Sequence, residues 1–290
     1  MACTAADAAV VFCKEDAVLR QITDIKELQT ILLGALQHFD AFCRQHGLQY
    51  FLANGTLLGA AKYEAFVPWD DDVDILMPRE SYEKLLEIYN NGGKYRLLSE
   101  KTASGWRLPY AKLTDTDTVQ REGEYDFGAE LGVSVDIFPL DRWYPGKTAA
   151  KWQALWCECL KRMLICANGP GFSTEKRGIK RLILWLIWAA GKVLGTKRLL
   201  RLIRRRAEKS ARYPETYVGC VSWTCHGAGE VLSAALFEET LELRFCGGSY
   251  PAPAGYTAYL CALYGDWKAE LPADQQKSNH TITAWRKYEE

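Results

Sequence analysis

The sequence predicts an α+β fold: a mixed sheet of the α/β type, with a helical insertion and a C-terminal extension. Helical and strand patterns alternate through the first half of the 290 residues, as in a sheet covered by helices. Helical periodicity then dominates, and short strand patterns return near the end. We therefore expect a core at 22–144, a helical insertion at 145–215 and C-terminal elements at 216–290 that pack on the core.

The elements follow from periodicity and from residues that begin or end helices. Residues 1–20 suggest a loose lead-in. Asp24 and Glu27 are spaced to cap an amphipathic helix that ends near Gly47. We expect strands at 48–53, 72–76, 95–99, 106–113 and 132–138, and helices at 55–61, 82–89, 149–166 and 177–210.

Composition narrows the classes of function. The chain has 36 basic and 36 acidic residues, so the basic excess typical of a nucleic-acid binder is missing. Its ten cysteines form no CxxC pair, which argues against a zinc site of the usual spacing. No secretory pattern precedes the core, so we expect a cytoplasmic protein with free thiols, and disulfides only if the chain is exported.

Two aspartates flank Val73 on the strand expected at 72–76. Alternate side chains of a strand share a face, so Asp72 and Asp74 point to the same side, roughly 7 Å apart along the strand. Asp136 has the same setting in the apolar strand 133–138. If the two strands are neighbours, three carboxylates share one face. A hard divalent cation, Mg²⁺ or Mn²⁺, best explains such a cluster.

A set of motifs surrounds these aspartates: GTLLGA (55–60), PWDDDVD (68–74), PR (78–79), VDIFPLD (135–141) and the weaker LYGDW (263–267). A lone Asp-x-Asp would be weak, whereas the combined set is specific and anchors the chain from about 22 to 285. This set resembles the nucleotidyltransferase fold and, within it, the LicD/fukutin-like phosphotransferase family.

The resemblance implies transfer of a substituted phosphate, most often phosphocholine, from a CDP-linked donor such as CDP-choline. The acceptor would be a glycan hydroxyl of a cell-surface polysaccharide or glycolipid, such as lipopolysaccharide or teichoic acid, and CMP would leave. Choline, ethanolamine, glycerol and ribitol donors fit the motifs equally. The alternatives are a nucleotidyltransferase that releases pyrophosphate and an inactive binding relative, which the three intact aspartates disfavour.

The resemblance and the chemistry together suggest residue roles. Asp72 and Asp74 are expected metal ligands, and Asp136 is a third ligand or the general base. Gly55 and Thr56, before a short helix, would cradle donor phosphates. Lys112 could pair with a phosphate or be a solvated strand lysine.

Four further residues have two alternative roles each. Arg79 could clamp phosphate, although pairing with Glu83 is the simpler expectation. Asp70 and Asp71 precede the strand and are expected to serve a turn rather than a metal. The family pattern places a histidine near His280, which would otherwise be a solvated residue.

The segment 181–206 is apolar at first and strongly basic afterwards. Its apolar run is far shorter than the ~20 residues needed to span a bilayer. One interpretation is a peripheral helix on the inner face of an anionic membrane. The alternative is a buried helix followed by a solvated basic helix.

Overall fold

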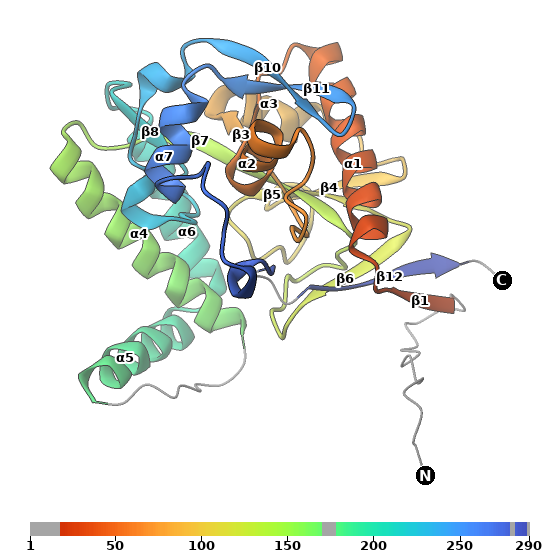
Figure 1. Ribbon diagram of the computed structural model, residues 1–290. Coiled ribbons are helices and arrows are strands. Elements are labelled where there is room, and N and C mark those ends of the chain that lie inside the picture. The colour runs from red at the N-terminus through yellow and green to blue at the C-terminus, as the bar shows by residue number, and fades with distance from the viewer. Residues whose placement is uncertain (1–17, 170–177, 279–281, 289–290) are drawn as a thin grey trace.

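The computed structural model describes residues 18–169, 178–278 and 282–288, and a mixed sheet forms its centre (Figure 1). Two strands, β3 (Val73–Pro78) and β7 (Ser134–Arg142), run parallel, and the other pairs of this sheet are antiparallel. The prediction of an α+β fold is confirmed. The sheet has the order β2 (Phe51–Leu52), β3, β7, β5 (Ala111–Asp115), β4 (Tyr95–Leu98), and β8 (Tyr217–Gly219) joins β7 to β9 (Leu232–Ser233).

The first long helix, α1 (Ile25–His46), has the predicted ends. The Asp24 side chain accepts a hydrogen bond from the Lys26 N–H at 3.0 Å, and Gly47 closes the helix with φ of 60°. Glu27 does not complete a capping box, because its carboxylate pairs with Arg20 and Arg286. The helix α3 (Arg79–Ile88) lies beside α1 and is followed directly by Tyr89, whose ring packs on Phe42 of α1.

A second, three-stranded sheet ties the two ends of the described chain together. It has the order β1 (Val18–Ile22), β12 (Ile282–Tyr288), β6 (Thr118–Glu122), and all its pairs are antiparallel. The prediction of a loose lead-in up to residue 20 is therefore wrong from Val18 onward. Pairing with a strand 260 residues away orders this segment, and no local pattern could report that.

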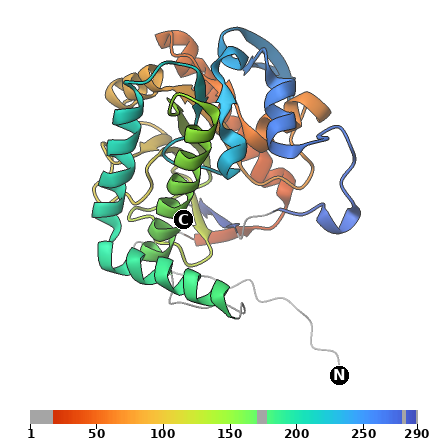
Figure 2. The same cartoon turned by 90° about the vertical axis from the view of Figure 1, so that its left-hand side faces the viewer.

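Three helices form a layer on one side of the molecule: α4 (Lys147–Asn168), α5 (Ile179–Leu194) and α6 (Thr196–Ser210) (Figure 2). The helical block expected at 177–210 is two helices, which separate at Gly195 with φ of 69°. Among the described residues, no helix has both the length and the apolar character needed to cross a bilayer.

The remaining elements include short helices and a two-stranded sheet. They are α2 (Asn54–Tyr63), η1 (Gly227–Glu230), η2 (Ala234–Phe237), β10 (Thr240–Phe245), β11 (Gly248–Pro253), α7 (Tyr256–Tyr264) and η3 (Ala273–Gln275). The helix α7 is bonded to the start of α2, because the Tyr259 hydroxyl donates to Asn54 Oδ1 at 3.0 Å.

Candidate active site

A cavity of about 420 Å³ lies where the starts of β3 and β7 meet the beginning of α2. The C-terminal part of the chain closes it with Trp223, His226 and Tyr264. Its polar lining is dominated by acidic groups, namely Asp70, Asp71, Asp72, Asp74, Glu122 and Asp136. The cavity thus gathers side chains from segments spread over more than 200 residues.

The sheet register brings two of the predicted aspartates side by side. Asp74 of β3 is paired with Asp136 of β7 in the parallel ladder, so their side chains leave the same face of the sheet. Asp72 immediately precedes β3 and lines the same cavity. The expected neighbourhood of the two strands is confirmed, and the three carboxylates meet at one site.

Asp74 is buried among other carboxylates. Burial raises the pKa of its carboxyl well above the ordinary value, and the charges of Asp72 and Asp136 raise it further. A hydrogen bond with the Asn54 side chain opposes this shift in pKa only in part. Clustered, desolvated carboxylates of this kind are stable as anions only when a cation offsets them.

Asp136 is held by two neighbouring side chains. Lys112 Nζ lies 2.6 Å from its Oδ1, and the Tyr110 hydroxyl donates to its Oδ2 at 3.3 Å. Burial raises the pKa of Asp136 to about 6, while Lys112 acts in the opposite direction. Lys112 is itself buried and also pairs with Glu122 at 3.3 Å, so it is not the solvated strand lysine of the alternative interpretation.

Asp70 and Asp71 are closer to the site than the sequence suggested. Carboxylate oxygens of Asp70, Asp71 and Asp72 lie within 4.8 Å of one another. Because β3 begins at Val73, Asp71 precedes the strand, and its carboxylate accepts a hydrogen bond from Ser278 at 2.7 Å. The Asp70 backbone does form the expected turn, because its N–H donates a hydrogen bond to the Val67 carbonyl at 2.9 Å.

Gly55 and Thr56 have different roles in the structure. Gly55 lines the cavity, and a Cβ there would come within 2.5 Å of Asp70 Oδ2, so only glycine leaves this carboxylate in place. Thr56 is buried, and its hydroxyl accepts the Asp74 N–H at 2.9 Å. The Thr56 side chain therefore positions the strand that carries Asp74, and of the two residues Gly55 is the one that lines the cavity.

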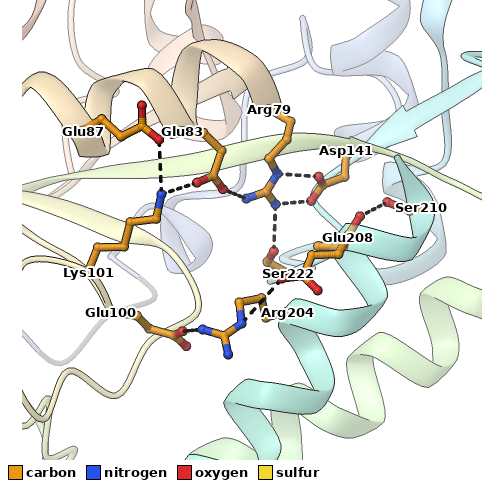
Figure 3. Close-up of polar contacts among 11 residues, drawn as sticks. Arg79, Glu83, Glu87, Glu100, Lys101, Asp141, Arg204, Glu208, Ser210 and Ser222 are labelled. Atoms are coloured by element: carbon orange, nitrogen blue, oxygen red, sulfur yellow. Dashed lines mark hydrogen bonds and ion pairs between the residues drawn. The ribbon is translucent and has the colours of Figure 1, made fainter. Parts of the chain in front are cut away.

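The structure does not bring Arg79 to the carboxylate cavity. Its guanidinium forms a two-pronged ion pair with Asp141, at 2.8 and 2.7 Å, and a third contact with Glu83 at 3.1 Å (Figure 3). The expected pairing with Glu83 is present, and Asp141 is the stronger partner. With its donors engaged in this way, Arg79 does not fit the role of a phosphate clamp.

Arg79 instead borders a second cavity, of about 650 Å³, between α3 and α6. Lys101 and Arg204 also line it, and both pair with glutamates, as Figure 3 shows. Tyr110 lines both cavities, so its ring stands between this cluster of ion pairs and Asp136.

Of the residues predicted near the C-terminus, some reach the cavity and others do not. His280 lies outside the described residues. Tyr264 of the LYGDW motif lines the carboxylate cavity, and its ring contacts His226 edge-on, whereas Trp267 is buried against Tyr256.

Sequence reasoning missed several residues of the site. Asn54, Tyr110, Glu122, Trp223 and His226 all line the cavity. For Asn54 a signal existed, since an asparagine before Gly-Thr tolerates the left-handed backbone found there, with φ of 44°. The others reach the site only through tertiary folding.

The lining fits a hard divalent cation. Every acidic ligand candidate offers carboxylate oxygens, the donor type that Mg²⁺ and Mn²⁺ prefer. The mutual repulsion that raises the pKa of Asp74 would be relieved by a cation beside Asp72 and Asp74.

Comparison with known proteins gives one family and two relatives. Residues 47–158 match the family described as LicD/FKTN/FKRP, nucleotidyltransferase domain. The lipopolysaccharide cholinephosphotransferase LicD of Haemophilus influenzae is 25% identical over 281 residues, which cover 90% of this chain and 97% of that protein. Mannosyltransferase regulator 4 of Saccharomyces cerevisiae is 28% identical over 102 residues, 35% of this chain and 8% of that protein.

Proposed function

Because the chain belongs to the LicD/fukutin-like family, we propose that it is a phosphotransferase that moves phosphocholine from CDP-choline to a glycan hydroxyl. The observation that carries the proposal is the meeting of Asp72, Asp74 and Asp136 in one cavity. Similarity to the Haemophilus cholinephosphotransferase over nearly its full length supports the choice of reaction.

In the proposed reaction the acceptor oxygen attacks the phosphorus that bears choline. The bond from that phosphorus to the CMP oxygen breaks, and CMP leaves. Asp136 takes the hydroxyl proton, a role that suits a carboxyl whose pKa of about 6 lies near neutrality. Lys112 keeps this carboxylate oriented, and Tyr110 contacts its other oxygen.

Asp72 and Asp74 would hold Mg²⁺ or Mn²⁺, with Asp70 and Asp71 close enough to contribute. When bound, the cation would offset the charge of the donor diphosphate. Gly55 lines the cavity at the first turn of α2, where backbone N–H groups favour phosphate.

Aromatic rings beside the carboxylates favour choline among the possible head groups. Tyr110, Trp223 and Tyr264 line the cavity, and the rings of Tyr110 and Trp223 lie 5.4 Å apart. Aromatic faces are the usual partners of a quaternary ammonium. Ethanolamine, glycerol and ribitol donors would make weaker use of them.

The test measures the release of CMP from CDP-choline, once in the presence of Mg²⁺ and once in the presence of EDTA, with mass spectrometry as the detection method. We expect CMP only with the metal, and none from Asp74→Asn, whose melting temperature should equal or exceed that of the wild type because repulsion falls. CMP from another CDP-linked alcohol alone would change the head group. Pyrophosphate released from a nucleoside triphosphate would support the nucleotidyltransferase alternative. If no product forms with any donor and acceptor, the result would support a binding role.

We also propose that the protein works in the cytoplasm, at the inner face of the membrane, where a lipid-linked glycan would be presented. Because the described helices are not of the kind that crosses a bilayer, such contact would be peripheral.

A further inference from the structure

The apolar helix α5 turns its large side chains to solvent. Gly191 is its one buried residue, although the helix carries two tryptophans and several leucines and isoleucines. A helix that is apolar on most sides is normally buried in a core or in lipid. Its exposed large residues are Ile179, Leu182, Ile183, Trp185, Leu186 and Val193.

The outer side of α4 continues this apolar surface. Trp152, Leu155 and Trp156 are exposed at spacings of three and four, and Ile165 follows. Of the fifteen exposed large hydrophobic residues in the described parts of the chain, ten lie on α4 and α5. Gly191 lets α5 pack closely on α4, since a Cβ there would come within 2.4 Å of the Met163 carbonyl oxygen. The two helices lie against each other (Figure 2), and their exposed apolar residues are called here the α4–α5 surface.

Cations surround this surface although the whole chain is neutral. The described residues of this region, 147–169 and 178–212, contain 15 lysines and arginines against two glutamates. The helix α6 packs Leu199 and Ile203 inward and exposes Arg198 and Arg201. The apolar surface and the positive charge meet at Trp156, because the Arg206 guanidinium lies 5.5 Å from the centre of its ring.

The arrangement contradicts one of the two sequence interpretations of 181–206, that of a buried helix followed by a solvated basic helix. The apolar helix is the exposed one, and the basic helix is partly buried. Exposed tryptophan and aliphatic side chains next to a surplus of cations match the chemistry of an anionic bilayer, whose interior takes apolar groups and whose headgroups attract lysine and arginine. A nucleic acid would use the cations and leave the apolar residues in water.

We propose that the α4–α5 surface docks the protein on an anionic lipid bilayer. The helix α5 lies in the plane of the interface with Ile183 and Trp185 among the acyl chains, and Arg198 and Arg201 of α6 contact anionic headgroups. This inference deepens the membrane contact of the proposed function by naming its surface, and it does not depend on the proposed reaction, because binding to vesicles requires neither donor nor acceptor.

Flotation of the full chain with vesicles tests the proposal. We expect the protein to float with vesicles of equal parts phosphatidylcholine and phosphatidylglycerol, and to stay at the bottom with phosphatidylcholine alone. The double variant Ile183→Glu/Trp185→Glu should lose at least about tenfold in bound fraction. Ile88→Glu, an equally apolar exposed position on α3, is the matched control and should float like the wild type.

Charge reversal provides a second readout. Arg198→Glu/Arg201→Glu should weaken binding to the anionic vesicles and reduce its dependence on salt. Circular dichroism and light scattering verify that each variant is folded and report its mass. The proposal is overturned if the wild type stays at the bottom with anionic vesicles or if the Ile183/Trp185 variant floats as well as the wild type. It is also overturned if the wild type is a dimer and that variant a monomer, because a second copy then covers the surface.

Discussion

The Lys112 ammonium lies 2.6 Å from the Asp136 carboxylate and 3.3 Å from that of Glu122, so the same buried cation serves two acids of the cavity. Replacement by methionine keeps the apolar stem and removes the charge. Because breaking a buried pair leaves an uncompensated charge, Lys112→Met should lower the free energy of unfolding by about 3 kcal/mol. Urea unfolding measures this loss. Lys101→Met removes an ion pair with Glu83 in which both side chains are at least 40% exposed, and should cost about 1 kcal/mol or less.

The pH dependence of the proposed activity should follow Asp136. Its pKa of about 6 means that the carboxylate form, which accepts a proton, predominates above pH 6 and is lost below it. We expect kcat/KM to fall about tenfold for each pH unit below this pKa, and this fall is the acidic limb of the pH profile. Raising the Mg²⁺ concentration should move the limb to lower pH, because a nearby cation favours the carboxylate.

Lys112→Met gives the pH profile its control. Lys112 lowers the pKa of Asp136, so the limb of this variant should move to higher pH. A limb that stays where it is in the variant, or activity that rises as the pH falls, would contradict the assignment of Asp136.

Gly55→Ala should impair the site with little effect on stability. The added Cβ would approach Asp70 Oδ2 to 2.5 Å, and the carboxylate, as the end of a side chain, can move away. We expect about a tenfold rise in the Mg²⁺ concentration needed for half-maximal activity, in line with displaced partners of a metal site. Gly93→Ala, where an added Cβ meets nothing within 4 Å, should leave the metal titration unchanged.

Local patterns carried the sequence predictions that succeeded. The spacing of apolar residues and the Asp24 and Gly47 ends defined α1, and strict alternation in 133–138 put Asp136 on a strand face. Neighbouring strands then placed Asp136 beside Asp74. These features depend on a few consecutive residues, and periodicity reports such features well.

The features that were missed depend on residues far apart in sequence. The ion pair of Arg79 joins it to Asp141, 62 residues away, and the nearer Glu83 was the only partner that local spacing could suggest. The pairing of β1 with β12 and the position of Trp223 in the cavity also depend on residues far apart in sequence. The sequence left the exposure of α5 open between a peripheral and a buried helix, because an apolar helix is ordinarily expected inside.

Trp223→Leu should reduce the selectivity for choline. The substitution keeps an apolar side chain and removes an aromatic face that lines the cavity beside Tyr110. We expect the KM for CDP-choline to rise at least about threefold relative to that for CDP-glycerol. Trp152→Leu, on the outer side of α4 and assayed without vesicles, should change neither KM. An equal rise for both donors would show that Trp223 does not distinguish the head group.

The contact between Arg79 and Asp141 should stabilise the fold without binding the donor. Asp141 is buried with only 2% of its side chain exposed, so Arg79→Met strands a carboxylate. We expect a loss of about 3 kcal/mol in unfolding free energy and an unchanged KM for the donor at temperatures where the variant is folded. Arg79→Met/Asp141→Leu removes both charges and should lose less than the sum of the single losses. A phosphate clamp predicts the opposite result, a donor KM raised tenfold or more that Asp141→Leu cannot restore.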